Sequence, residues 1–326
     1  MKFRRSQLLA LSGLGIAAIV LLNTSGIPYI TLERRWAIGI YTGSSPTRLA
    51  DAAGAVNPVL TANDVTDVSA RFVADPFMIR KDSLWYMFFE VMNRERDRGE
   101  IGAATSNDGL HWRYLKIVLT EPFHLSYPYL FEFGGDYYMV PEAGQTQSIR
   151  LYRATAFPVQ WEYVATLLSG ASFSDTSLFR YQQRWWLFTT PRPGLNDTLS
   201  LYYADKLEGP WREHPRSPVV SGNPHIARSA GRVTLFGDRL VRFAQDDSPT
   251  YGTRVWAFEL AELDEFRYAE KPLGGSPVTQ GGWGGWNSRG MHHVDPHQVG
   301  ADQWIACVDG STRGWETRRY RWKRGN

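Results

Sequence analysis

Short apolar runs separated by polar turns recur along this chain at a nearly constant interval. In the first clear case, an apolar run ends at Asp75-Pro76, a polar turn follows at 81–83, and an aromatic run from Trp85 ends at Glu90. Strand-length apolar runs joined by a short polar turn predict a β-hairpin. This hairpin carries one acidic residue at each end.

The same hairpin pattern returns twice, beginning at Tyr127 and at Asp175. The three starts are 52 and then 48 residues apart, and the second hairpin ends at Glu142, 15 residues after its start, as in the first. A tryptophan follows each hairpin at a matching place, with steps of 49 and 50 residues: Trp112, Trp161 and Trp211. Four short strands per repeat of about 50 residues predict the blades of a β-propeller.

We therefore predict an all-β fold, a five-bladed β-propeller over residues 34–311. An isolated strand pattern at 36–43 is expected to complete the last blade, because joining both chain ends leaves the ring without a free sheet edge. Residues 44–67 are expected to form an irregular arm. The blades are expected at about 70–122, 123–171 and 172–220, with a less regular fourth from 221 and a short fifth that includes 291–308.

Residues 1–30 have the pattern of a membrane-targeting leader. Basic residues precede a charge-free apolar segment at 8–22, and no clear cleavage pattern follows it. We expect an uncleaved signal-anchor helix, with the propeller outside the cytoplasm, in a periplasm or at the cell surface. A cleaved signal peptide is the alternative.

The distribution of charge argues against a nucleic-acid partner. The formal net charge is +3, but basic residues concentrate in the leader and in a tail at 312–326, so the middle of the chain has an acidic surplus. The tail is either a solvated end or a contact to an acidic lipid surface. The single Cys307 excludes an intramolecular disulfide, and its apolar neighbours indicate a buried thiol.

Propeller geometry predicts a funnel at the centre of the molecule. The first strand of each blade lines the central channel, so equivalent positions meet there although they are far apart in sequence. Glu90 and Glu142 add acids from the ends of second strands, and Tyr127 and Trp85 are expected to form aromatic walls. The other predicted funnel residues are Asp75, Asp175, His225, Arg228, His292 and His293.

Paired acids on such a funnel suit glycosidic-bond chemistry, in which one carboxylate activates a nucleophile and another group donates a proton. We single out Asp75 and Asp175 as the pair. Glu142 follows an apolar strand, where burial would raise its pKa as an acid catalyst requires. The competing interpretation is structural: an aspartate at a strand start caps a turn or pairs with an arginine, and Glu142 pairs with Arg150 or Arg228.

No cofactor or metal is predicted. His293, Asp295 and His297 alternate along an extended segment, but Pro296 interrupts it and no cysteine or further carboxylate is near. A single histidine facing substrate oxygens, or a hydrated cation such as calcium in the channel, fits this pattern better than zinc. The usual nucleotide, metalloprotease and nucleophile-elbow motifs are absent from the sequence.

These hairpins also carry a family resemblance. The segments are Ala74-Asp75-Pro76-Phe77, Ser126-Tyr127-Pro128-Tyr129 with 138–143, and Phe173-Ser174-Asp175-Thr176 with 185–188. They resemble the N-terminal domain of the glucosamine inositolphosphorylceramide transferase family, which is similar to the five-bladed propellers of arabinanase, xylosidase and invertase-type glycosidases. The resemblance implies a carbohydrate-linked role in glycolipid or envelope polysaccharide assembly. It matches Asp75 to the base or nucleophile and Asp175 to the acid that orients substrate.

The chain departs from the glycosidases where the fourth blade opens. The resemblance places a glutamate general acid there, but the segment at 223–228 has none. Glu142 or His225 replaces it, or the site binds sugar without cleaving it. Only a basic tail follows residue 311, so the transferase domain of the plant family is not expected.

The leading hypothesis is thus a glycoside hydrolase-like or glycosyl-transferring propeller of the cell envelope that acts on a glycan or glycolipid. The alternatives are a non-catalytic glycan-binding or scaffold propeller serving a separate glycosyltransferase, and a protein-interaction propeller.

Overall fold

The computed structural model describes residues 29–191, 194–275 and 277–318. The predicted anchor at 8–22 and the end of the basic tail lie outside these residues. Within them, no helix combines the length and the apolar character that crossing a bilayer requires. The chain divides into a large unit, Trp36–Thr312, and a small one made of Met1–Arg35 and Arg313–Asn326.

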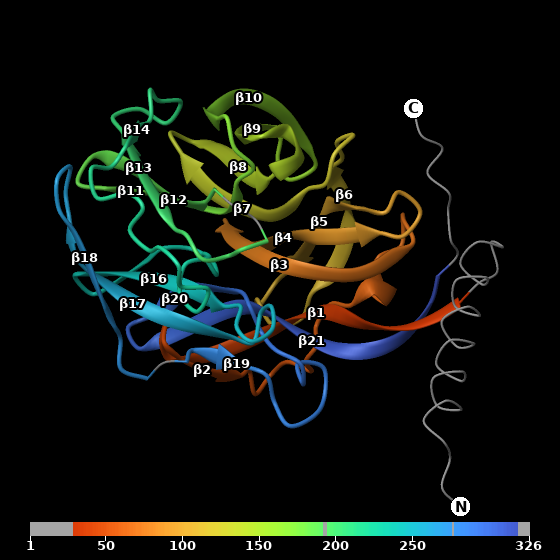
Figure 1. The fold of residues 1–326 in the computed structure, drawn as a ribbon. Coiled ribbons are helices and arrows are strands. Elements are labelled where there is room, and N and C mark those ends of the chain that lie inside the picture. Colours follow the sequence, from red (N-terminus) through yellow and green to blue (C-terminus); the bar gives the residue numbers. More distant parts are fainter. Residues whose placement is uncertain (1–28, 192–193, 276, 319–326) are drawn as a thin grey trace, which may run out of the picture. The chain divides into compact units, whose positions relative to one another are not determined.

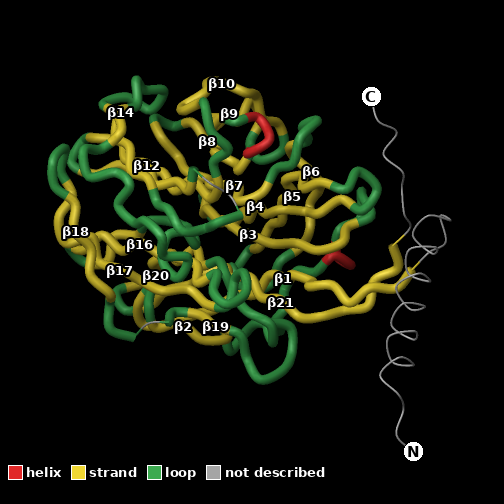
Figure 2. The backbone as a smooth tube through the Cα atoms, in the orientation of Figure 1, coloured by secondary structure: helices red, strands yellow, loops and turns green. Residues whose placement is uncertain are grey.

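Five antiparallel sheets of the large unit are arranged around one axis, as a five-bladed propeller (Figures 1 and 2). In blades 1 to 4 the strands follow chain order from the innermost strand outward. Blade 1 contains β3 (Ala70–Lys81), β4 (Leu84–Asn93), β5 (Arg98–Ser106) and β6 (Arg113–Leu119). Blade 2 contains β7 (Ser126–Phe133), β8 (Asp136–Glu142), β9 (Ser148–Ala156) and β10 (Gln160–Ser169).

The third and fourth blades follow the same order with less regular strands. Blade 3 contains β11 (Ser174–Tyr181), β12 (Arg184–Thr190), β13 (Ser200–Ala204) and β14 (Arg212–Glu213). Blade 4 contains β15 (Thr234–Phe236), β16 (Arg239–Asp246), β17 (Arg254–Leu263) and β18 (Tyr268–Pro272), and the short β19 (Thr279–Gln280) also pairs with β17.

Blade 5 combines two strands from the beginning of the described chain with two strands from its end. Its order is β20 (Val294–Gly300), β21 (Gln303–Arg318), β1 (Tyr29–Ser45) and β2 (Arg48–Asp51). β2 lies inside the segment predicted to be an irregular arm, so that prediction was wrong at 48–51. After β1 the chain turns back, and β2 pairs antiparallel with residues Tyr41–Ser45 of β1. β2 is therefore the fourth and outermost strand of the blade.

The innermost strands of blades 1 to 3 share an irregularity at one equivalent position. The pairing register shifts around Asp75, Tyr127 and Asp175, and each of these residues has a positive φ, 53°, 44° and 46° respectively. A positive φ is uncommon for any residue other than glycine and is typical of a β-bulge that redirects the strand. The repeat seen in the sequence is therefore also a repeat of backbone conformation.

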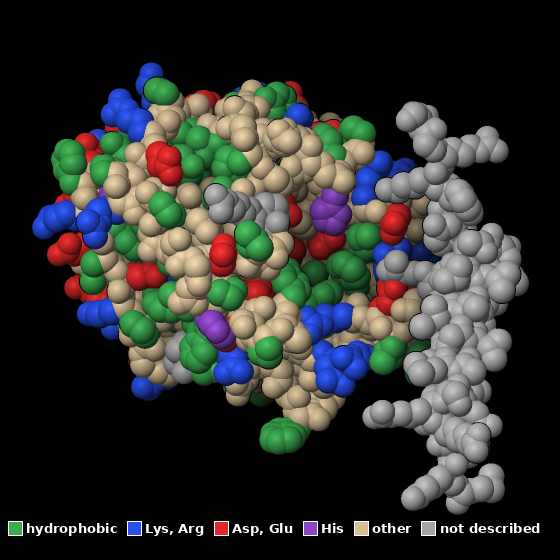
Figure 3. All heavy atoms as spheres, in the orientation of Figure 1, with side chains coloured by type: hydrophobic (Ala, Val, Ile, Leu, Met, Phe, Trp, Pro, Cys, Tyr) green, Lys and Arg blue, Asp and Glu red, His purple; other side chains and the backbone are tan. Residues whose placement is uncertain are grey.

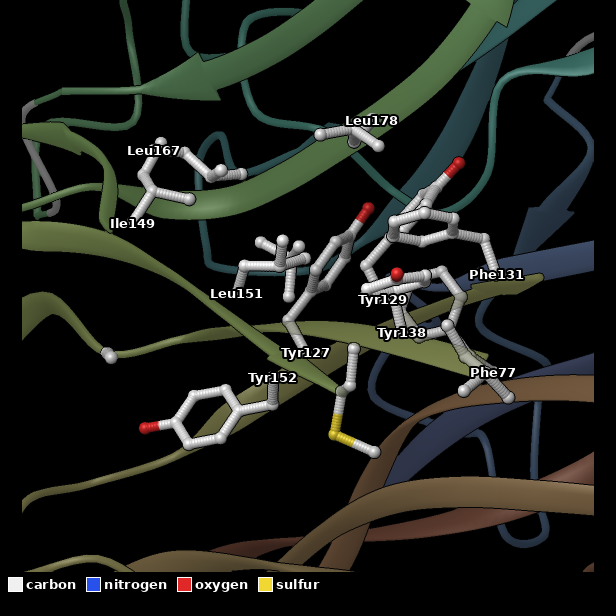
Figure 4. Close-up of a cluster of buried hydrophobic side chains, with 14 of the residues drawn as sticks. Phe77, Tyr127, Tyr129, Phe131, Tyr138, Ile149, Leu151, Tyr152, Leu167 and Leu178 are labelled. Atoms are coloured by element: carbon white, nitrogen blue, oxygen red, sulfur yellow. The ribbon is translucent and has the colours of Figure 1, made fainter. Parts of the chain in front are cut away.

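The hydrophobic core lies between neighbouring blades. Figure 4 shows one such layer, in which Phe77 of blade 1, Tyr127 and Leu151 of blade 2, and Leu178 of blade 3 are all fully buried or nearly so. Flat sheets packed face to face leave wide gaps, and large aromatic side chains fill them. This packing accounts for the high aromatic content of the chain.

A buried ion pair crosses the axis below the funnel. Arg232 donates from Nε to Asp295 Oδ1 at 2.7 Å and from Nη1 to the carbonyl of Leu130 at 2.9 Å. Asp295 Oδ2 also accepts the backbone N–H of Met78 at 2.8 Å. Burial opposes ionisation of Asp295, but the Arg232 cation lowers its pKa. Blades 1, 2, 4 and 5 are thus tied together at the floor of the funnel.

Candidate functional site

The site occupies the end of the propeller where the inner hairpins are open. Acidic side chains gather there in a hollow near the middle of the face shown in Figure 3. Five acidic side chains of this part of the propeller are buried or largely buried and close enough to interact electrostatically: Asp75, Glu90, Glu142, Asp175 and Asp309.

The three bulges build the site by linking each blade to the one before it. The backbone N–H of Asp75 donates to Asp309 Oδ2 of blade 5 at 3.1 Å, and that of Tyr127 donates to Asp75 Oδ2 of blade 1 at 3.3 Å. The N–H of Asp175 donates to Glu142 Oε2 of blade 2 at 3.2 Å. Each bulge amide therefore holds a carboxylate of the preceding blade at the mouth of the channel.

Asp175 is fixed on one side of the site. Arg228 donates from Nε to its Oδ2 at 2.5 Å and from Nη2 to its Oδ1 at 3.3 Å, and Gln245 donates to Oδ2 as well. The same guanidinium lies 3.6 Å from Glu142 Oε2 and 5.2 Å from the ring centroid of Tyr251. The Arg228 cation therefore interacts with two carboxylates and one aromatic ring on this side of the funnel.

His292 connects the two acids on the opposite side. Its Nδ1 lies 2.7 Å from Asp309 Oδ1 and its Nε2 lies 3.5 Å from Asp75 Oδ1, while Trp36 stacks on its ring at 3.9 Å. Burial opposes protonation, but Asp309 and then Asp75 raise the pKa of His292. Asp309 is also desolvated, yet His292 lowers its pKa. The ligand atoms of Asp75, His292 and Asp309 lie within 4.8 Å of one another, so these three side chains could hold a metal ion.

Three acids of the site are held with raised pKa values. Burial, followed by the nearby Asp175, raises the pKa of Glu142 to about 8. Burial raises the pKa of Asp75 to about 7 although His292 opposes the shift. Burial and then Asp75 raise the pKa of Glu90 well above its usual value. At neutral pH the funnel therefore contains carboxyl groups that can donate a proton and others that can accept one.

Glu90 has a buried carboxylate oxygen without a hydrogen-bond donor among the described residues. Its Oε1 lies 3.5 Å from His124 Nε2 and accepts no hydrogen bond from the residues that the structure describes. The pKa of His124 is lowered by burial, so this histidine supplies little positive charge. A buried acceptor left without a donor is costly, and it is ready to accept a hydrogen bond from a ligand.

Of the two predicted aromatic walls, neither faces the hollow. Trp85 lies at the far end of β4, five residues and about 16 Å from Glu90. Tyr127 is fully buried, and its hydroxyl accepts the N–H of Gly231 at 2.7 Å and lies 3.0 Å from Ser177 Oγ. The sequence reasoning placed both rings correctly on inner hairpins, but it could not see which way each ring turns from its strand.

His293 and His225 were predicted to lie in the funnel, but neither contacts the acids of the site. His293 is completely buried between the rings of Phe77 and Tyr127, and burial lowers its pKa to about 4. Neither of its ring nitrogens has a hydrogen-bond partner among the described residues. His225 is about half exposed, and its Nδ1 lies 2.8 Å from Asp246 Oδ1. His225 therefore belongs to the rim.

Sequence reasoning missed several residues of the site. Asp309 had a visible signal, because it ends the apolar run 304–308 just as Glu90 and Glu142 end theirs. Gln245, Tyr251 and Trp36 had none. Nothing in their local sequence distinguishes them from ordinary residues of a strand or a turn.

A comparison with protein families identifies close sequence relatives. The model described as "Glucosamine inositolphosphorylceramide transferase 1, N-terminal" matches residues 31–311. Glucosamine inositolphosphorylceramide transferase 1 of Oryza sativa subsp. japonica is 36% identical over 310 residues, covering 88% of this chain and 42% of the relative. The Arabidopsis thaliana protein of the same name is 32% identical over 300 residues, covering 85% of this chain and 39% of the relative. The chain thus spans less than half the length of these curated relatives.

Two solved structures with a similar fold are carbohydrate-active enzymes. The catalytic domain of a GH62 α-L-arabinofuranosidase from Coprinopsis cinerea superposes with a TM-score of 0.59 at 12% identity, covering 85% of this chain and 97% of that one. A β-1,2-mannobiose phosphorylase from Listeria innocua superposes with a TM-score of 0.60 at 13% identity, covering 83% of this chain and 96% of that one. At this identity the likeness concerns the fold alone.

Proposed function

Because this chain belongs to the family of N-terminal domains of glucosamine inositolphosphorylceramide transferase 1, we propose that its funnel binds the sugar of a glycan or glycolipid and acts on a glycosidic bond. The observation that supports this proposal is the set of buried carboxyl groups that adjacent blades bring together. Burial raises the pKa of Glu142 to about 8 and that of Asp75 to about 7, so both can carry a proton near neutral pH. His292 Nε2, 3.5 Å from Asp75 Oδ1, favours the ionised form of Asp75, whereas the nearby Asp175 favours the protonated form of Glu142.

In the proposed reaction, Glu142 gives its proton to the oxygen that leaves the anomeric carbon. Asp75 takes a proton from the water or sugar hydroxyl that attacks this carbon, and solvent returns the proton to Glu142. Water as acceptor gives hydrolysis, and a hydroxyl as acceptor gives glycosyl transfer. Asp175, held by Arg228 and Gln245, orients the sugar and keeps Arg228 close to Glu142.

A second candidate is a glycan-binding propeller without catalysis. One observation favours it: Arg228 forms a two-point contact with Asp175 and also approaches Glu142, so two of the predicted catalytic acids are partly neutralised. Under this proposal the funnel presents a glycan or glycolipid to a separate glycosyltransferase.

The substitution Asp75→Asn separates the two candidates when turnover and binding are both measured. The substrates would be a panel of neutral and amino-sugar glycosides together with extracted glycolipid head groups. The control is Asp82→Asn, the same change at an exposed acid that also has a positive φ and lies in the hairpin turn at the other end of β3. Asparagine tolerates that conformation, so the control variant should fold normally.

The enzyme proposal expects parent turnover that Asp75→Asn lowers at least a hundredfold, with sugar binding retained and Asp82→Asn unchanged. Binding by the parent without turnover on any substrate would support the non-catalytic candidate. No binding and no turnover would refute both.

We also propose that the propeller lies outside the cytoplasm and is held at a membrane through residues 8–22. Basic residues before the apolar segment support this orientation. A reporter enzyme active only outside the cytoplasm, fused after residue 326, tests it. Activity of the fusion is expected, and activity only from a cytoplasmic reporter would contradict the orientation.

A further inference from the structure

The glycine-rich segment 281–286 forms a loop with one tryptophan anchored and the other projecting into solvent. Trp286 is half-buried and lies flat on blade 5, where two strands have glycines beneath it. A Cβ on Gly39 of β1 would lie 2.6 Å from the Trp286 ring, and one on Gly310 of β21 would lie 2.5 Å from it. Trp283, flanked by glycines on both sides, is fully exposed.

A second loop adjoins the first and also presents an apolar side chain. Asn57 is fixed by two hydrogen bonds to the backbone of Ile40, at 2.8 and 2.9 Å, and meets the same edge of Gly39 that Trp286 covers. Its neighbour Val56 is 88% exposed. Two apolar side chains, Trp283 and Val56, therefore project from neighbouring loops.

Both loops are free of charge over a long stretch. Residues 52–63 and residues 277–288 contain no Asp, Glu, Lys or Arg, in a chain where 21% of residues are charged. Contact of these loops with an apolar medium would desolvate no ionised side chain of their own. An uncharged loop of this kind can insert below the head groups without moving an ionised side chain toward the hydrocarbon, which would be costly.

The glycine-rich loop begins and ends beside the funnel. Gly281 donates its N–H to the carbonyl of Thr253 at 3.4 Å, and Gly290 packs so closely against Gly252 that a Cβ would lie 2.0 Å from the Gly252 carbonyl oxygen. Gly252 in turn packs against His292 of the site. The loop between β19 and β20 thus begins and ends next to residues that pack on the site, and it extends beyond the edge of blade 5 (Figure 1).

We propose that Trp283 and Val56 dock into the lipid–water interface of a bilayer. An indole suits this position because its ring is apolar and its N–H can bond to head-group oxygens. This docking rests on the tether proposed above, the charge-free apolar segment at 8–22, which would keep the propeller close to a bilayer. A single exposed tryptophan and valine give weak contact by themselves, so the tether and the loop act together.

Site-specific labelling of the full chain tests this proposal without any measurement of turnover. Trp283→Cys would be labelled with an environment-sensitive fluorophore after reconstitution into vesicles of phosphatidylcholine and phosphatidylglycerol. Native Cys307 is completely buried and should not react, which the unsubstituted chain checks. The matched control is Ser83→Cys, an exposed turn residue at the opposite end of the blade 1 hairpin.

The proposal expects blue-shifted emission at position 283 and quenching by spin-labelled lipid at least twofold stronger than at position 83. Equal quenching at the two positions would overturn it. A blue shift at 283 without lipid quenching would also overturn it, because it would indicate a protein partner or a second copy of the chain. Loss of sugar chemistry in Asp75→Asn would leave this result unchanged, so the two proposals fail independently.

Discussion

Replacing Glu142 by glutamine should make the protein more stable, although it removes a proposed catalytic group. The pKa of Glu142 is raised from 4.5 to about 8, mainly by burial. Below about pH 4.5 this carboxyl group is protonated in both the folded and the unfolded protein, so it does not lower the free energy of unfolding. As pH rises from about 4.5 to about 8, the unfolded chain ionises first and the folded protein loses stability. Glutamine has the same shape but does not ionise, so the variant keeps its free energy of unfolding over this pH range.

The size of the effect follows from the shift. Between pH 4.5 and pH 7 the penalty grows to roughly 3 kcal/mol, since each pKa unit corresponds to about 1.36 kcal/mol. Glu142→Gln should therefore match the parent near pH 4.5 and exceed its free energy of unfolding by up to about 3 kcal/mol at pH 7. Part of this gain is offset because the weak contact to Arg228, at 3.6 Å, is lost.

Urea unfolding at pH 5, 6, 7 and 8 would measure the difference. The control is Glu270→Gln in blade 4, a largely buried glutamate whose pKa is lowered because Arg242, against the cost of burial, binds it through two hydrogen bonds. This variant leaves the Arg242 cation unpaired, so it should lose about 3 kcal/mol at every pH tested. If Glu142→Gln were less stable than the parent at pH 7, or if its difference did not grow between pH 5 and pH 8, the assignment of a raised pKa to Glu142 would be refuted.

Three further predictions concern the frame around the funnel. Arg232→Met should lower the free energy of unfolding by about 3–5 kcal/mol in urea titrations, because Asp295 would remain buried without its cation; a loss below about 1 kcal/mol would contradict this role. Tyr127→Phe should cost about 1–3 kcal/mol by the same measurement, since the N–H of Gly231 loses its buried acceptor, and an unchanged midpoint would argue against this bond. Gly231→Ala should prevent normal folding, because φ is +136° and a Cβ would lie 1.9 Å from the carbonyl oxygen of Val294; a native circular dichroism spectrum and melting temperature would disprove this.

The architecture was predictable because equivalent residues of successive blades recur about 50 positions apart in the sequence. Hairpins that begin at Asp75, Tyr127 and Asp175 and end 15 residues later specify strands, turns and their order around an axis. Positions at the start of the first strand and at the end of the second strand of a blade also predict which residues approach the channel. The strand β2 escaped prediction because its four residues, Arg48–Asp51, are mostly exposed and have no apolar pattern.

The site was predictable only in part, because side-chain direction depends on the bulges. A bulge turns the peptide N–H of Asp75, Tyr127 or Asp175 toward the preceding blade, and no propensity scale signals a positive φ at a tyrosine. For this reason the sequence identified Tyr127 as a wall, while the structure buries its ring. The cation shared by Asp175 and Glu142 was anticipated as the structural alternative for Glu142, and it is Arg228.

The order of strands in blade 5 has a consequence for biosynthesis. β1 leaves the ribosome long before its neighbour β21, which begins only at Gln303. At about 5–20 residues per second, β1 waits on the order of 10–50 s for that partner. During this interval its apolar residues, such as Ile38 and Ile40, are an unpaired edge that a holding chaperone would be expected to cover. Stalled or shortened translation products should therefore aggregate through their N-terminal strand, even when blades 1 to 4 are already complete.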